Sequence, residues 1–191
     1  MLKSALLSAG LFCVIVFVSC SGDKNNDLAY PYHYDTYYPL GFGNKWVYKH
    51  SPGTEEQTVI INGIRRFERK EIFTFGGNDV FYFNLTNNKN NSGLFYKRGD
   101  LWGSVNGKEC LILRADPGVG EKYDLASINK GILEVLSLNE KYEHFNCLKI
   151  KYTLGNDYWY FWLSKGFGIV KVYCSFDNST YEIQSYTLAT N

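Results

Sequence analysis

Cysteine, histidine and carboxylate side chains are the groups in this sequence that could act as nucleophiles, metal ligands or proton-transfer groups. The 191 residues include five Cys, three His and 19 Asp or Glu. His33, His50 and His144 are scattered, without the i, i+4 spacing of a helical metal pair and without a neighbouring Cys, so no metal site is expected. The chain also lacks a Walker loop, a Gly-x-Ser-x-Gly elbow and an HExxH motif. The sequence therefore predicts a protein that is not an enzyme and needs no cofactor.

Three of the cysteines, Cys110, Cys147 and Cys174, lie in the second half of the chain with no C-x-x-C spacing. In an oxidising compartment one pair of them could form a disulfide and leave one odd thiol. Alternatively, all three could remain as buried free thiols, because free Cys is among the most buried residue types. The spacing does not decide between the two.

A targeting segment occupies the first 20 residues. Lys3 is followed by an apolar stretch from Leu6 to Val18, which is short for a membrane span and typical of a signal peptide. Small Ser19 then precedes Cys20, and this arrangement resembles the lipobox of bacterial lipoproteins. The resemblance implies cleavage between Ser19 and Cys20, with acyl chains attached to Cys20. An ordinary secretory signal cleaved near Ser19, or an uncleaved anchor, are the alternatives.

The charge balance indicates how such a chain would be held at a membrane. The net charge is +1, and removal of Lys3 with residues 1–19 leaves 19 basic and 19 acidic residues. A neutral chain offers neither a basic membrane clamp nor a nucleic-acid surface, so acyl chains on Cys20 must supply the membrane anchor. Ser21 follows the Cys, and in the lipoprotein families this position favours sorting to the outer membrane of the cell envelope when it is not Asp.

Composition shifts divide the mature chain into a tether, residues 20–36, and a single β-rich domain, residues 37–191. Residues 21–27 are a solvated linker of Ser, Gly, Asp, Lys and Asn. The aromatic cluster that follows could be a platform that stacks on sugars or peptides, or a segment that covers an apolar face of the body. Its members are Tyr30, Tyr32, His33, Tyr34, Tyr37 and Tyr38.

The sequence of residues 37–191 predicts an all-β fold, with about a dozen strands in an antiparallel meander that forms a strongly curved sheet, half-barrel or barrel. Aromatic residues make up 17% of the chain, and turn signals recur at short intervals. Hairpin turns are expected at Asn62-Gly63, Gly76-Gly77 and Asn106-Gly107, with a strand over residues 79–85. At most one short helix is expected, within residues 124–138, where a strand over 132–138 is equally compatible.

Alternation within single segments places individual side chains. Trp46 and Tyr48 share one face of a strand and should point into the core. Residues 158–163 are apolar on both faces, so that strand should be central or covered on both sides. In the last strand the alternation of apolar and polar residues shifts by one position near Ser185, which predicts a bulge there.

Four segments resemble a group of uncharacterised bacterial envelope lipoproteins. They are YYPLGFGNKWVY (37–48), ILRADPGVGEKYD (112–124), HFNCLKIKY (144–152) and WLSKGFGIVKV (162–172). Tyr123 stands where that group commonly has Trp. The resemblance implies an all-β envelope domain with no known catalytic residues.

The leading functional prediction is a non-enzymatic envelope lipoprotein whose β-domain binds a lipid, a glycan or a protein partner. A structural or assembly lipoprotein without a small ligand is the alternative, and a hydrolase of envelope polymers is a third hypothesis. A solvent-open cavity lined by aliphatic and Phe side chains would favour the first, a filled interior the second, and clustered acids or His in a cleft the third.

Overall fold

The structure is a computed structural model that describes residues 35–67, 70–83, 92–127 and 129–189. Ser19, Cys20 and the aromatic residues up to Tyr34 lie outside these ranges. The described chain is all-β, with one short 3-10 turn, η1 (Asp79–Tyr82). Its strands are β1 (Lys45–Ser51), β2 (Glu56–Phe67), β3 (Lys70–Gly76), β4 (Ser92–Lys97), β5 (Asp100–Val105), β6 (Lys108–Leu113), β7 (Lys122–Asp124), β8 (Ile132–Tyr142), β9 (Phe145–Leu154), β10 (Asp157–Ser164), β11 (Gly168–Cys174) and β12 (Ser179–Thr187).

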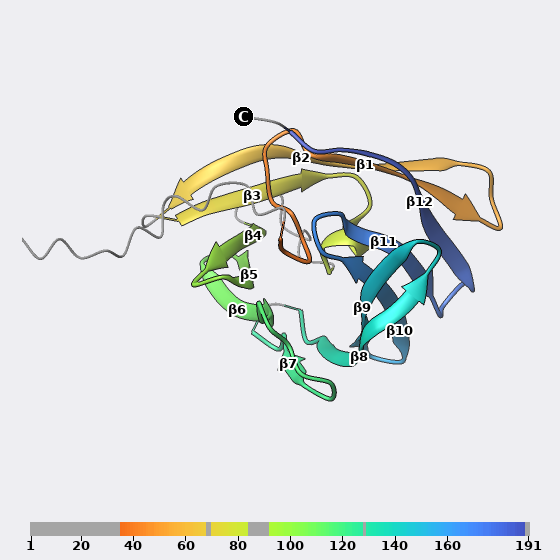
Figure 1. Ribbon diagram of the computed structural model, residues 1–191. Helices are drawn as coiled ribbons and strands as arrows, with labels where there is room; N and C mark the ends of the chain where they lie inside the picture. Colours follow the sequence, from red (N-terminus) through yellow and green to blue (C-terminus); the bar gives the residue numbers. More distant parts are fainter. Residues whose placement is uncertain (1–34, 68–69, 84–91, 128, 190–191) are drawn as a thin grey trace, which may run out of the picture.

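All twelve strands form one antiparallel sheet that curls almost into a barrel (Figure 1). Its order is β6-β5-β4-β3-β2-β1-β12-β11-β10-β9-β8-β7, so each strand neighbours the next one along the chain, as a meander requires. The exception is the step from β6 to β7, which are the two edges of the sheet. The first strand pairs with the last, and the opening of the barrel therefore lies in the middle of the sequence.

Local sequence explains the tight turns. Asn106 and Gly107, between β5 and β6, both have positive φ, at 52° and 79°. Arg98 and Gly99 repeat this between β4 and β5, at 57° and 88°. Two consecutive positive φ angles define the turn whose twist matches that of the flanking strands, which is why Gly is favoured at the second position. The expected Asn106-Gly107 hairpin is thereby confirmed.

The hairpin expected at Asn62-Gly63 is wrong. Both residues lie inside the long strand β2, where the pairing register with β3 shifts between Ile61 and Gly63. Gly63 does not have the positive φ that the turn would need. Instead of reversing the chain, the extra residue forms a β-bulge that bends the strand. The first half of β2 pairs with β1 and the second half continues alongside β3 alone.

The strand expected over residues 79–85 is also wrong as far as the chain is described. Residues 79–82 form η1, and Phe83 follows with φ of 59°. Phe81 and Phe83 are fully buried, because this apolar run enters the barrel instead of joining its wall. Between residues 124 and 138 the strand alternative holds, since residues 132–138 belong to β8.

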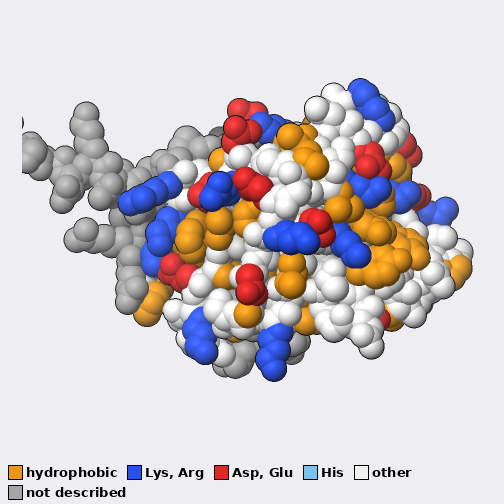
Figure 2. All heavy atoms as spheres, turned by 90° about the horizontal axis from the view of Figure 1, so that it is seen from below, with side chains coloured by type: hydrophobic (Ala, Val, Ile, Leu, Met, Phe, Trp, Pro, Cys, Tyr) orange, Lys and Arg blue, Asp and Glu red, His pale blue; other side chains and the backbone are white. Residues whose placement is uncertain are grey.

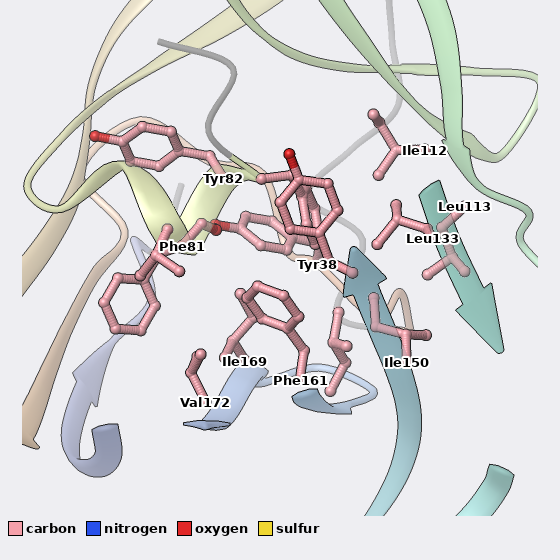
Figure 3. Packing of buried hydrophobic residues seen from close by; sticks show 14 of the residues in the cluster. Tyr38, Phe81, Tyr82, Ile112, Leu113, Leu133, Ile150, Phe161, Ile169 and Val172 are labelled. Atoms are coloured by element: carbon pink, nitrogen blue, oxygen red, sulfur yellow. The ribbon is translucent and has the colours of Figure 1, made fainter. Parts of the chain in front are cut away.

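The interior of the curved sheet is filled by side chains (Figure 3). Tyr38, from the segment before β1, donates a hydrogen bond from its hydroxyl to the Phe81 carbonyl at 2.7 Å. The rings of Phe81 and Tyr48 stack with centroids 4.2 Å apart. Around them lie Ile112 and Leu113 from β6 and Leu133 from β8, on the two sides of the opening, and Phe161, Ile169 and Val172 from β10 and β11. One continuous core therefore links both halves of the meander.

The Gly-Asn-x-Trp segment at the start of the body joins the two ends of this fold. Asn44 is buried, donates from Nδ2 to the Pro39 carbonyl at 3.0 Å, and accepts a hydrogen bond at Oδ1 from the Ala189 amide at 2.8 Å. Trp46 and Tyr48 lie in the core as expected, each 2% exposed. The bulge expected near Ser185 is confirmed by the register shift between β1 and β12. Within the described ranges, no helix is long and apolar enough to cross a bilayer.

Candidate functional site

Strand β10 separates its aromatic side chains onto two faces of the sheet. Trp159, Phe161 and Leu163 point inward and belong to the core. The alternate residues Tyr158, Tyr160 and Trp162 therefore point outward, where all three are partly exposed. The expectation that this strand is central is confirmed, because β10 lies between β9 and β11, whereas its outer face is only partly covered.

Neighbouring strands surround these three rings with lysines and one more tyrosine. We call this surface the aromatic–lysine face. It consists of Tyr158, Tyr160 and Trp162 on β10, Lys149 and Lys151 on β9, Lys171 and Tyr173 on β11, and the acidic Glu140 on β8 and Glu182 on β12. On the face of the molecule seen in Figure 2, hydrophobic side chains gather in one large group beside basic and acidic ones, on the side where β9 and β10 lie in Figure 1.

Ammonium groups and ring faces alternate across this surface. The Lys149 amine lies 4.7 Å from the Trp162 ring centroid and 5.3 Å from that of Tyr160. The Lys151 amine lies 4.7 Å from the Tyr158 ring centroid. A cation at such a distance is attracted by the negative face of an aromatic ring. These contacts hold the rings and the lysines in fixed relative positions.

Two carboxylates order the lysines further. Glu140 Oε1 accepts hydrogen bonds from Lys149 Nζ at 2.7 Å and from Trp162 Nε1 at 3.0 Å. Partial burial alone would raise the pKa of Glu140, but these two hydrogen bonds and the charge of Lys149 outweigh it and lower the pKa below its ordinary value. The carboxylate therefore stays ionised at neutral pH and fixes both the amine and the indole.

Glu182 plays the same part on the other side of Trp162. It accepts a hydrogen bond from Lys171 Nζ at 2.8 Å, which lowers its pKa. Lys171 in turn lies 4.7 Å from the Tyr142 ring centroid. Lys151 differs from the other two, because no carboxylate of the described ranges lies within 4.0 Å of its amine. The surface thus carries three positive charges against two negative ones.

A small second core supports this surface from beside it. Phe145, Cys147 and Val170 are buried on the outer side of the sheet, and Trp162 packs against them. Cys147 is thereby on the outer side, whereas Cys174 belongs to the inner core. The three cysteines are free and buried. Opposite sides of the sheet keep Cys147 and Cys174 apart, which decides the open question of a disulfide between them.

The remaining candidate groups are not brought together. His50 on β1 stacks on Tyr181 at 4.6 Å, while His144 lies against Phe145 in the β8–β9 turn. Asp177 accepts a hydrogen bond from the Ser179 amide and so caps a turn. In the parts of the chain that the structure describes, no group of three or more His, Cys, Asp or Glu could hold a metal ion.

Of the aromatic cluster before the body, the described members behave as a cover and not as a platform. Tyr38 is buried inside the barrel and Tyr37 is partly buried against it. Tyr30, Tyr32, His33 and Tyr34 lie outside the described residues, as do Ser19 and Cys20. The sugar-stacking interpretation therefore fails for Tyr38, whose ring faces other core rings.

A pocket of about 290 Å³ opens at the other end of the molecule, by the β2–β3 and β5–β6 hairpins. Arg65 and Arg66 form one wall, and buried Ser104 lies in another. Phe67 and Ser92, which also line the pocket, each lie next to a gap in the described chain. A smaller space of about 40 Å³ lies beside Tyr37 and Tyr96. Its size is that of a site for water and not for an acyl chain.

Comparison with known proteins gives no family. No protein-family model matches the chain, and no curated protein matches it. Among solved structures, a “putative lipoprotein” from Parabacteroides distasonis aligns with a TM-score of 0.43 and 12% identity, over 80% of this chain and 99% of that one. A “putative exported protein with YmcC-like fold” from Bacteroides fragilis aligns with a TM-score of 0.38 and 12% identity, over 81% and 100%.

Proposed function

We propose that this chain is a bacterial envelope lipoprotein whose β-body acts by binding a partner on its outer surface, without catalysis. Acyl chains on Cys20 would anchor it, and Ser21 favours the outer membrane. The anchor follows from the signal sequence and the position of Cys20, because two or three acyl chains, at about 0.8 kcal/mol per buried methylene, hold a protein at a membrane essentially permanently.

The observation that carries the binding role is the contrast between the two sides of the sheet. The inner side is closed by Tyr38, Phe81 and Phe83, so the concave surface that could have received an acyl chain is occupied by the protein itself. The outer side presents the aromatic–lysine face. A ligand would therefore meet the protein at that face, and a glycan or a protein fits it better than a lipid tail.

The alternative is a structural or assembly lipoprotein that takes no small ligand. The filled interior favours it over a lipid carrier, because a packed core gives the barrel rigidity and leaves no room for cargo. The two hypotheses differ in whether the aromatic–lysine face has a ligand of its own. Hydrolysis of an envelope polymer has less support, since Glu140 and Glu182 are each engaged by a lysine.

Phase partitioning of the full-length protein expressed in a bacterial host tests the anchor. The Cys20→Ala variant should remain a larger precursor that lacks acyl chains. The Cys13→Ala variant is the matched control, because it removes a thiol from the same segment and should be processed and partition like the wild type. Equal size and equal detergent partitioning of the Cys20→Ala and wild-type proteins would overturn the lipoprotein assignment.

Titration with the fluorescent fatty acid cis-parinaric acid tests the filled interior. The chain that begins at Ser21, which lacks the signal peptide and the acyl anchor, should show no saturable fluorescence increase in detergent-free buffer. The Phe81→Ala variant is the comparison: its cavity is about the size of one aromatic ring, too small for an acyl chain, so its titration should also stay flat. Saturable binding by the wild type would instead support a lipid carrier.

A further inference from the structure

We propose that the aromatic–lysine face binds an acidic polysaccharide, a linear chain of sugars that carry carboxylate groups. This inference rests on the proposed surface-binding role, but it does not depend on the lipid anchor. It commits the face to one class of ligand among the glycans, proteins and lipids considered above.

The rings supply the stacking surface. Tyr158, Tyr160 and Trp162 occupy alternate positions of one strand, so successive ring attachment points are about 7 Å apart along it. The cross-strand partner of Tyr160 is Tyr173, whose ring lies at 6.1 Å with an interplanar angle of 23°. The electron-rich face of an aromatic ring attracts the slightly positive C–H groups on one side of a pyranose. Successive rings along β10 are turned by 61° and 67° to each other, so each ring would meet a different sugar of a polymer whose units repeat and turn along its axis.

The polar groups supply the rest of the recognition. Every aromatic side chain of the face is Tyr or Trp, so each ring carries a hydroxyl or an indole N–H besides its apolar surface. Lys151 is the cation without a carboxylate partner among the described residues, and it lies beside Tyr158. Glu134 lies opposite Lys151 in the β8–β9 register, but its carboxylate pairs with Lys122 at 3.5 Å. A sugar stacked near Tyr158 would therefore place a carboxylate within reach of a lysine that has no ion pair of its own among the described residues.

Composition argues against a protein partner at this face. Protein–protein interfaces are enriched in Tyr, Trp and Arg and depleted in Lys and Glu. The aromatic–lysine face carries three Lys, two Glu and no Arg. Lys149 and Lys171 are also already bound by Glu140 and Glu182, so a protein would have to break or bury two existing ion pairs.

Geometry argues against a membrane surface and charge against a nucleic acid. The rings are only partly exposed and are held between lysines, so they cannot reach the roughly 5–10 Å into a bilayer that interfacial anchors reach. A single excess positive charge cannot neutralise a run of phosphates, on which nucleic-acid affinity depends. A polymer with spaced carboxylates and many hydroxyls needs neither deep insertion of the rings nor a large excess of positive charge.

Affinity gel electrophoresis of the mature lipoprotein in mild detergent tests the proposal. Polygalacturonate cast into the gel is the acidic probe, and dextran is the neutral one. The wild type should be retarded by polygalacturonate more than by dextran. Tyr158→Ala and Tyr160→Ala should each weaken retardation about tenfold, the usual loss for an aromatic residue at the centre of a binding surface. Tyr160→Phe keeps the ring and should bind within about twofold of the wild type, as expected when stacking dominates.

Matched controls come from the far end of the barrel. Phe67→Ala removes an aromatic side chain that is 55% exposed at the end of β2, and Lys108→Ala removes an exposed lysine of β6. Both should bind like the wild type, whereas Lys151→Ala should lose the preference for polygalacturonate over dextran. Thermal melts identify any variant that has lost its fold. If an alanine variant does not fold, the comparison of Tyr160→Phe and Lys151→Ala with the wild type still tests the proposal.

Several results would overturn the proposal. They are an absence of retardation by polygalacturonate, equal retardation by dextran, and retardation that survives both alanine substitutions of the tyrosines. If the alanine variants changed the oligomeric state of the protein while polysaccharide changed no variant's mobility, the aromatic–lysine face would be assigned to a protein contact. Each of these outcomes leaves the Cys20→Ala result unaffected, so failure here is distinguishable from failure of the lipoprotein assignment.

Discussion

The indole Nε1 of Trp46 donates a hydrogen bond of 2.7 Å to the main-chain carbonyl of Phe167, 121 residues further along the chain. Two residues later, the Tyr48 hydroxyl bonds the Ile169 carbonyl at 2.8 Å. The first strand thus holds the turn between β10 and β11 as well as its own neighbours. Gly168 lies between the two carbonyls with φ of 88°, and a side chain there would come within 3.4 Å of Trp46 Nε1. The late Gly-x-Gly motif and the early Trp motif are therefore two sides of one contact.

Loss of the Trp46 ring should destabilise the body strongly. Trp46→Ala removes a large side chain that is 2% exposed together with its hydrogen bond, and should cost about 3–5 kcal/mol of unfolding free energy. Trp46→Phe keeps most of the packing and should cost less. Denaturant unfolding of the mature protein measures both.

Deletion of residues 21–29 is the control for the position of the domain boundary. These residues carry almost no apolar side chains, so ordering them would recover little of the roughly 1–2 kcal/mol per residue that fixing a backbone costs. The deletion should leave the melting temperature nearly unchanged. A large drop in the melting temperature of the deletion variant would show that the domain begins before residue 37. A Trp46→Ala protein as stable as its parent would show that Trp46 is not part of the core.

Asn44 should contribute more to the stability of the body than the size of its side chain suggests. Asn44→Ala leaves the Pro39 carbonyl and the Ala189 amide without their side-chain partner, and should cost about 1–3 kcal/mol. Asn146→Ala, at an exposed position of β9, is the matched control and should be within about 0.5 kcal/mol of the wild type. Thermal unfolding of both variants compares them, and equal destabilisation would refute a special role for Asn44.

Part of this fold follows from the sequence alone, for physical reasons that single elements make clear. The alternation of Leu148, Ile150 and Tyr152 with lysines predicts a strand with one buried face, and β9 has it. The Asn106-Gly107 turn is predictable because its backbone angles favour those residue types. Asn62-Gly63 has the same chemistry, yet continuous pairing of β2 with β3 on either side of these residues overrides it and leaves a bulge.

Other features depend on contacts between distant residues. The run that contains Phe81 and Phe83 is apolar enough for a strand, and only the curvature of the whole sheet makes it a filling for the interior. The aromatic–lysine face escapes sequence analysis for a similar reason. Its tyrosines alternate with core residues within one strand, so they indicate burial on both sides, and their lysines come from other strands.

The three body cysteines should be unreactive in the folded protein. Burial raises the pKa of the Cys147 and Cys174 thiols to about 11 and that of Cys110 to about 12. At pH 8 a thiol with a pKa of 11 is only about 0.1% thiolate, the reactive form. The disulfide reagent DTNB should therefore label none of them under native conditions and all three in denaturant. Rapid native labelling would show that a thiol is accessible.

Acid should weaken the outer side of the sheet. The hydrogen bond from Lys171 lowers the pKa of Glu182 below its ordinary value of 4.5, so its contribution to stability is full above that pH and is lost as the pH falls through the lowered pKa. Glu182→Gln should flatten this part of the acid dependence while changing little at very low pH. Chemical denaturation between pH 6 and the acid range compares the slopes. An unchanged slope in the variant would remove Glu182 from the explanation.

Native mass spectrometry of protein gently extracted from its own membranes can show whether this chain is a lipid-anchored protein that works through its surface. The spectrum should show a chain that begins at Cys20, carries the mass of covalent acyl groups, and releases no further lipid when it is unfolded. An unmodified amino terminus, or a non-covalent lipid that leaves only on unfolding, would contradict that expectation.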